Sequence, residues 1–156
     1  MRAEGFTLIE LLVTVAIVAV LASVALPLNE LAVQRAKEQD LRRSLREIRE
    51  AIDAHKQAFD DGRIARRAGD SGYPKRLEEL VAGIEDQRSQ SKERIYFLRR
   101  IPRDPFAGDA SLGAAATWGK RSYRSPPDEP REGDDVFDVF SLSSAIGING
   151  RPLKEW

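Results

Sequence analysis

The chain begins with a short polar stretch and then becomes apolar over the length of a membrane span. After Glu10, no charged residue occurs over residues 11–28, which are rich in Val, Ala, Leu and Ile. As an α-helix this run would be about 27 Å long, close to the ~30 Å hydrocarbon thickness of a bilayer. The pattern predicts a helix over residues 6–28 that can cross a membrane, with Pro27 near its far end, where a kink is tolerated.

Beyond residue 28 the pattern becomes that of an amphipathic helix. Residues 29–60 contain neither Gly nor Pro, and good helix formers dominate. The apolar residues recur at helical spacing and form one stripe: Leu41, Leu45, Ile48, Ala51, Ile52, Ala58 and Phe59. We therefore expect one continuous helix that ends at about Asp60, followed by Gly62 in a left-handed conformation.

The remaining chain carries weaker signals for a short helix and a small sheet. Residues 74–83 predict a short helix, and residues 85–93 are polar and predict an exposed segment. Two strands are predicted, over residues 117–123 and 136–142, with a proline-rich turn between them. The expected fold class is α+β: a long N-terminal helix, membrane-spanning in its first half, packed against an antiparallel sheet at about residues 115–145.

Composition narrows the possible functions. The 156 residues include 25 Lys and Arg against 25 Asp and Glu, so the formal net charge is zero and no global field attracts nucleic acid. No cysteine is present, which rules out a disulfide scaffold or a thiolate metal site. Because the net charge is zero, no nucleic-acid partner is expected.

No constellation of catalytic residues stands out. His55 is the only histidine, and a lone imidazole beside an apolar stripe is more typical of a packed, hydrogen-bonded residue than of a base or ligand. The sequence has no Gly-rich phosphate loop after a strand and no carboxylate pair with acid–base spacing. We expect no enzymatic activity.

Glu10 is out of place at the start of an apolar run. Burying an unpaired carboxylate among Ile9, Leu11 and Leu12 would cost roughly several kcal/mol of free energy, because the charge would lose its hydration. Either Glu10 reaches water at the rim of the bilayer, or a partner satisfies its charge.

The residues around Glu10 resemble the type IV pilin and pseudopilin family. Its precursors carry a short charged leader ending in Gly, then Phe-Thr-Leu-Ile-Glu and a long apolar helix, and residues 5–10 match at every position. The resemblance implies that a prepilin peptidase cuts between Gly5 and Phe6 and methylates the new amino group of Phe6. It also implies that Glu10 pairs with the amino terminus of a neighbouring subunit, and that Pro27 is the family's helix-loosening proline.

The same resemblance implies an organisation and a location. Residues 1–5 would be the leader, residues 6–28 the transmembrane and filament-core helix, and residues 29–156 the globular head. The protein would cross the bacterial inner membrane once, with its N-terminus cytoplasmic and its head periplasmic, before entering a periplasmic pseudopilus. Its partners would be copies of itself, prepilin peptidase, minor pseudopilins, the inner-membrane assembly platform and, before assembly, membrane lipid.

The function so implied is that of a structural subunit of a type II secretion pseudopilus, which supports protein secretion across the outer membrane. The lack of cysteine favours this branch, because many adhesive pilins close a loop with a disulfide. One alternative is a type IV pilus subunit for adhesion, motility or DNA uptake. Another is an anchored or secreted binding domain that never polymerises, including one exported by an ordinary signal sequence cut after residues 23–25.

Major pseudopilins, which the C-terminal region resembles, often bind calcium through an acidic loop. Here residues 143–150 contain no carboxylate, whereas calcium prefers six to eight oxygen ligands, usually including carboxylates. No cofactor is expected, and calcium stays a possibility that rests on a few oxygen-bearing residues: Asp134, Asp135, Asp138, Ser143 and Asn149.

Overall fold

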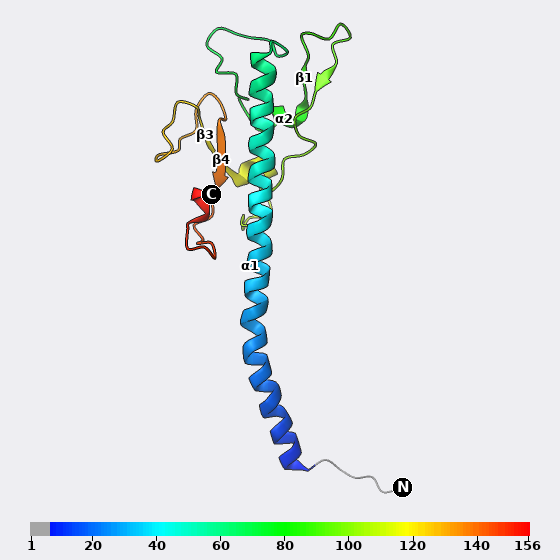
Figure 1. The fold of residues 1–156 in the computed structure, drawn as a ribbon, viewed down its shortest axis with the longest axis vertical. Helices are drawn as coiled ribbons and strands as arrows, with labels where there is room; N and C mark the ends of the chain where they lie inside the picture. Colours follow the sequence, from blue (N-terminus) through cyan, green and yellow to red (C-terminus); the bar gives the residue numbers. More distant parts are fainter. Residues whose placement is uncertain (1–6) are drawn as a thin grey trace. The chain divides into compact units, whose positions relative to one another are not determined.

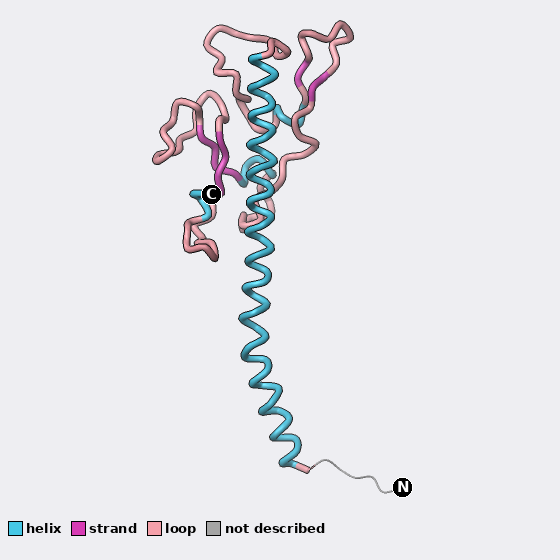
Figure 2. The backbone as a smooth tube through the Cα atoms, viewed as in Figure 1, coloured by secondary structure: helices cyan, strands magenta, loops and turns pink. Residues whose placement is uncertain are grey.

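A computed structural model describes residues 7–156 of the chain, with the side chains of residues 24–27 left out (Figures 1 and 2). The chain divides into two compact units, residues 1–36 and residues 37–156, and the second is called the head unit below. One helix, α1 (Leu8–Asp60), contributes residues to both units. The structure confirms the expected α+β class, with a long N-terminal helix and a small antiparallel sheet in the C-terminal part.

The predicted end of the long helix is confirmed at Asp60. Gly62 has a φ of 72°, and its N–H donates to the Phe59 carbonyl at 2.9 Å. The Arg63 N–H donates to the Ala58 carbonyl, also at 2.9 Å. Together these two bonds form a Schellman motif, which satisfies the last carbonyls of a helix and needs a left-handed residue at this position.

The apolar stripe of α1 forms one wall of the core of the head unit. Leu41, Ile48 and Ile52 have no exposed surface, and Leu45 is almost fully buried. They belong to one cluster with apolar side chains from the rest of the head unit: Leu77, Leu80, Leu98, Trp118, Val136, Val139 and Leu153. Burial of these side chains supplies the main favourable term in folding, at about 25 cal/mol for each Å² of apolar surface.

The predicted strand pair is present, although both strands are shorter than expected. β3 (Trp118–Arg121) and β4 (Asp138–Ser141) pair antiparallel, with Trp118 opposite Ser141 and Arg121 opposite Asp138. Figure 1 shows this hairpin beside the C-terminal half of α1. A 3-10 turn, η1 (Ala114–Thr117), leads into β3.

The predicted helix over residues 74–83 is wrong in extent, because only α2 (Glu79–Ala82) is α-helical. The residues before it form turns, and their backbone groups bind elsewhere. The Pro74 carbonyl accepts the Val136 N–H at 2.8 Å, and the Lys75 N–H donates to the Glu79 carboxylate at 2.9 Å. Gly83, with a φ of 77°, ends the element.

The polar segment over residues 85–93 is largely exposed, as expected, but it is the tip of a hairpin that the sequence pattern did not reveal. β1 (Ile84–Glu85) pairs antiparallel with β2 (Arg94–Ile95). Asp86 anchors the tip, because its carboxylate accepts two hydrogen bonds from the Arg63 guanidinium at 2.7 and 3.0 Å. These bonds hold the pKa of Asp86 below its usual range.

The C-terminal segment folds back along α1 after β4. A bridge joins Ile146 to Pro152, and a last 3-10 turn, η2 (Leu153–Glu155), buries Leu153 in the core. Glu38 of α1 is buried, and its carboxylate accepts the Ile148 N–H at 2.7 Å. The end of the chain is therefore held against the helix by polar contacts as well as by apolar packing.

Candidate functional site

The described residues cover only part of the predicted N-terminal site. Gly5 and Phe6, the expected cleavage and methylation positions, lie outside them. Pro27 lies within α1, but its side chain is also outside the description. Glu10 is fully described.

Glu10 and Thr7 together cap the N-terminus of α1. The Thr7 N–H and hydroxyl both donate to one Glu10 carboxylate oxygen, at 2.9 and 2.7 Å, and the Glu10 N–H donates back to the Thr7 hydroxyl at 3.3 Å. This reciprocal arrangement is a capping box, which satisfies backbone N–H groups that have no partner inside the helix. In the isolated chain, Glu10 thus has a local partner that the sequence analysis missed, although the spacing Thr-x-x-Glu signals it.

The helix beyond this cap presents apolar side chains all round. From Leu8 to Leu21 the large apolar residues are exposed, with 76% of the Leu8 surface and 51% of the Val13 surface accessible. Among the described residues, α1 is the one helix that is long and apolar enough to cross a membrane, by length and composition. An apolar helix without a buried face fits lipid or the apolar helices of other subunits.

Two of the three carboxylates considered for calcium, those of Asp135 and Asp138, are occupied by protein donors. Asp135 accepts hydrogen bonds from the Ser122 hydroxyl and the Tyr123 N–H, both at 2.8 Å. Asp138 forms ion pairs with Arg49 at 2.8 Å and Arg121 at 3.4 Å. Within the described part of the chain, no group of three or more His, Cys, Asp or Glu residues is arranged to hold a metal ion.

His55 is a packed core residue. It is 4% exposed, its Nδ1 lies 3.0 Å from the Gly72 carbonyl oxygen, and its ring contacts Phe97 with 5.3 Å between centroids. Burial lowers the pKa of the imidazole below its ordinary 6.5, against an opposing effect of the Gly72 carbonyl. A buried imidazole engaged in this way is poorly placed to act as a base on an external substrate.

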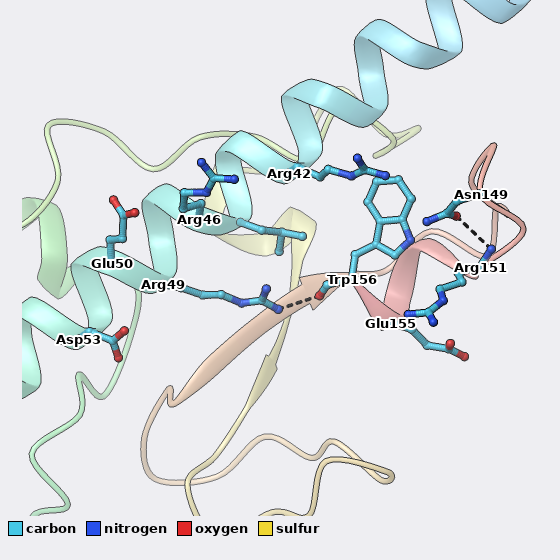
Figure 3. Close-up of a pocket in the computed structure, with 10 residues that line it drawn as sticks. Arg42, Arg46, Arg49, Glu50, Asp53, Asn149, Arg151, Glu155 and Trp156 are labelled. Carbon is cyan, nitrogen blue, oxygen red and sulfur yellow. Dashed lines mark hydrogen bonds between the residues drawn. The ribbon is translucent and has the colours of Figure 1, made fainter.

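Arginine side chains gather where the C-terminal residue meets α1 (Figure 3). Arg49 donates to the Asp138 carboxylate, to the Val139 carbonyl at 3.1 Å and to the Trp156 backbone oxygen at 2.8 Å. Arg42 lies over the Trp156 ring, 4.3 Å from its centroid, in a cation–π contact. These contacts fix the indole against the helix and leave a groove beside it.

Comparison with known proteins gives results that agree with these features. The family model described as the prokaryotic N-terminal methylation motif matches residues 1–26. Curated relatives named type II secretion system core protein G match along most of the chain. That of Klebsiella pneumoniae is 28% identical over 141 residues, covering 86% of this chain and 93% of the relative.

Two further relatives with the same name show that the similarity extends through the head. The protein of Dickeya chrysanthemi is 27% identical over 154 residues, covering 96% of this chain and 94% of the relative. That of Pectobacterium carotovorum subsp. carotovorum is 29% identical over 141 residues, covering 86% of this chain and 83% of the relative. No solved structure gives a significant match.

The methylation motif is confined to the N-terminal part of the chain, whereas the similarity to core protein G extends over most of it, and both lead to one interpretation. The motif covers residues 1–26, whereas the relatives also match residues that build the head. The N-terminal apolar helix fits anchoring in the inner membrane. Together they show that this chain carries the N-terminal methylation motif and is similar to core protein G of type II secretion along most of its length.

Proposed function

We propose that this chain is a structural subunit of a type II secretion pseudopilus, polymerised through its N-terminal helix. The observation that carries the proposal is the combination of an N-terminal methylation motif with similarity to core protein G over 96% of the chain. The all-round apolar surface of α1 over residues 8–23 supports it, because such a helix can exchange lipid for the helices of neighbouring subunits. Enzymatic activity forms no part of the proposal.

On this proposal the precursor is cut between Gly5 and Phe6, and residues 6–28 anchor it in the inner membrane. The head lies in the periplasm, and copies of the chain leave the membrane to form the filament. The partners are prepilin peptidase, other copies of the chain, minor pseudopilins, the assembly platform and, before assembly, lipid. Pro27 would loosen the helix near the end of the apolar run.

The intact mass of the protein from its native membrane tests the processing step. We expect a chain that begins at methylated Phe6. A chain that begins at Leu26 would identify an ordinary exported protein, and an uncut chain from Met1 would identify a plain anchor. Either of these results would exclude the proposed polymer.

Glu10 is the residue whose part in assembly can be separated from its part in the helix cap. Gln at this position keeps the reciprocal cap with Thr7, because glutamine serves in capping boxes, but it removes the charge. If the charge pairs with a neighbouring subunit, Glu10→Gln and Glu10→Ala both insert into the membrane and both give few filaments. Normal filament yield from Glu10→Gln would reduce the role of Glu10 to capping.

A further inference from the structure

The groove beside Trp156 has a row of arginines along one wall. Its volume is about 510 Å³, and Arg42, Arg46 and Arg49 of α1 follow one another at i, i+4 and i+7 (Figure 3). This spacing places the three side chains on one face of the helix. Arg151, from the C-terminal segment, lines the groove as well.

Two of these arginines, Arg46 and Arg151, have no polar side-chain partner among the described residues. Arg49 is committed to Asp138 and to the Trp156 backbone oxygen, and Arg42 lies over the Trp156 ring. Among the residues that the structure describes, the side chains of Arg46 and Arg151 form neither an ion pair nor a hydrogen bond. We define the arginine groove as Arg42, Arg46, Arg151 and Trp156.

Carboxylates also line the groove, and their positions show which end of it is positively charged. Glu50 and Asp53 lie farther along α1, away from Trp156, whereas Glu155 lies near Arg151 (Figure 3). The side of the indole that faces Arg42 and Arg46 is therefore the positively charged part. An acidic group is attracted to this end and repelled from the other, which gives the groove a direction.

The chain itself carries an exposed segment with complementary chemistry. Residues 126–132, the acidic proline loop, read Pro-Pro-Asp-Glu-Pro-Arg-Glu, and every one of them is exposed. Among the described residues, the Asp128 side chain forms neither an ion pair nor a hydrogen bond. Glu129 pairs with Arg131 at 2.7 Å, but these side chains are 69% and 71% exposed, so this pair contributes little and can exchange.

Prolines make this loop a suitable ligand as well as an acidic one. Pro126, Pro127 and Pro130 restrict its backbone, which lowers the conformational entropy lost on binding. Proline-rich segments bind to surfaces that present aromatic rings, and arginine forks bind carboxylates through paired hydrogen bonds. The arginine groove offers both kinds of group beside one another.

We propose that, in the polymer, the acidic proline loop of one subunit binds the arginine groove of a neighbouring copy. This inference rests on the proposed function and names a contact between heads. Because loop and groove are different surfaces, the contact is heterologous, and such contacts repeat into open helical assemblies when they do not close into rings. Charge pairs of this kind set the register and the rate of association more than the affinity.

Charge reversal in the full-length chain tests the contact. One variant carries Asp128→Arg with Glu129→Arg, a second carries Arg46→Glu with Arg151→Glu, and a third combines all four changes. We expect either reversed surface alone to lower filament yield about tenfold, because like charges then face each other. The combined variant restores yield to within about twofold of wild type, because the pairing is reversed but complementary.

Matched changes outside the two surfaces provide the control. Arg43→Glu and Asp61→Arg reverse exposed charges that do not line the groove or belong to the loop. Both should leave filament yield unchanged. The proposal is overturned if the single-surface variants assemble like the wild type, or if the combined variant assembles no better than either of them.

A crosslinking measurement separates failure of this contact from failure of the proposed function. The chain has no cysteine, so Pro127→Cys in the loop with Asn149→Cys, beside Arg151 at the basic end of the groove, creates one reactive pair. Ala54→Cys replaces Asn149→Cys in the control, because Ala54 is exposed but lies outside the groove. In membranes, a short bismaleimide should join subunits through the groove pair well above the control level.

If the wild-type chain forms no filaments, the proposed function fails, and the crosslink still reports the contact. If filaments form but the groove pair reacts no more than the Ala54→Cys control, the proposed function stands and the contact is excluded.

Discussion

At the residue scale, Arg49 joins three parts of the head through one guanidinium group. It reaches Asp138 at the start of β4, the Val139 carbonyl and the Trp156 backbone oxygen. The side chains of Arg49 and Asp138 are 38% and 28% exposed, so water screens part of this interaction. The hydrogen bonds still matter, because they connect α1 to residues about ninety or more positions away.

Replacing Arg49 with Ala is expected to lower the free energy of unfolding by about 1–2 kcal/mol, the range for charged hydrogen bonds reduced by partial exposure. Urea unfolding of the full chain in detergent, followed by tryptophan fluorescence, measures this change. Arg43→Ala is the control, because the Arg43 side chain is 77% exposed and its ion pair with Asp40 is long, at 3.7 Å. Equal effects of the two changes would remove the special role of Arg49.

The buried His55 should make the stability of the folded chain depend on pH. Its pKa is lower in the folded chain than the ordinary 6.5, chiefly because burial disfavours the charged imidazole. The unfolded chain therefore binds a proton first as pH falls, so stability is full above about pH 6.5 and decreases below it. His55→Gln should flatten the melting temperature across this window, and an unchanged pH profile would contradict the assignment.

The carboxylates titrate in a separate window. The pKa of Asp86 is below its ordinary 3.8 because of the Arg63 hydrogen bonds, so its contribution is present above that value and is lost only in more acidic solution. Hydrogen bonds also lower the pKa of Asp135, although burial alone would raise it. Because both windows lie at or below 3.8, the effect of His55 can be measured between them and neutral pH.

At the element scale, the β3–β4 hairpin depends on a position without a side chain. Gly119 lies opposite Phe140, and a Cβ there would come within 2.4 Å of the phenyl ring. Gly119→Ala should therefore destabilise the head by about 1–3 kcal/mol, because the ring must leave its place. Gly113→Ala is the matched control, since a Cβ there meets nothing within 4 Å and its φ of −62° suits alanine. Thermal unfolding of the two variants measures the difference.

The elements with long, regular patterns could be predicted from the sequence. The apolar stripe and Gly62 gave the end of α1 at the observed residue, because periodicity and a left-handed cap both act locally. The capping box of Thr7 and Glu10 was equally predictable from the Thr-x-x-Glu spacing, because it is also a local motif, whereas the charge of Glu10 indicates a distant partner. For the predicted site, the structure therefore adds a local role to Glu10.

The β1–β2 hairpin and the true extent of α2 could not be predicted, because long-range contacts decide them. The hairpin of β1 and β2 has only two residues in each strand, too few for an alternating pattern. The helix expected over residues 74–83 is shortened because Pro74 bonds to Val136, which is distant in sequence. The arginine groove likewise forms only where the C-terminal segment packs against α1, so no local sequence motif predicts it.

At the scale of the whole molecule, the core lies entirely within the head unit. The members of the buried cluster run from Leu41 to Leu153, and the head unit begins at Lys37. Outside residues 24–27, whose side chains are not described, the preceding residues of α1 expose their large apolar side chains. The apolar part of α1 should therefore contribute little to the folding of the head.

A chain that begins at Lys37 is therefore expected to fold alone and to stay monomeric. Its melting temperature should lie within about 5 °C of the value for the head in the full chain, because the lost residues cost less than about 1 kcal/mol of packing. Circular dichroism melts and size-exclusion chromatography measure both properties. An unfolded fragment would show that residues before Lys37 stabilise the head. A folded fragment that polymerises without residues 7–36 would move the main assembly surface from the apolar helix to the head.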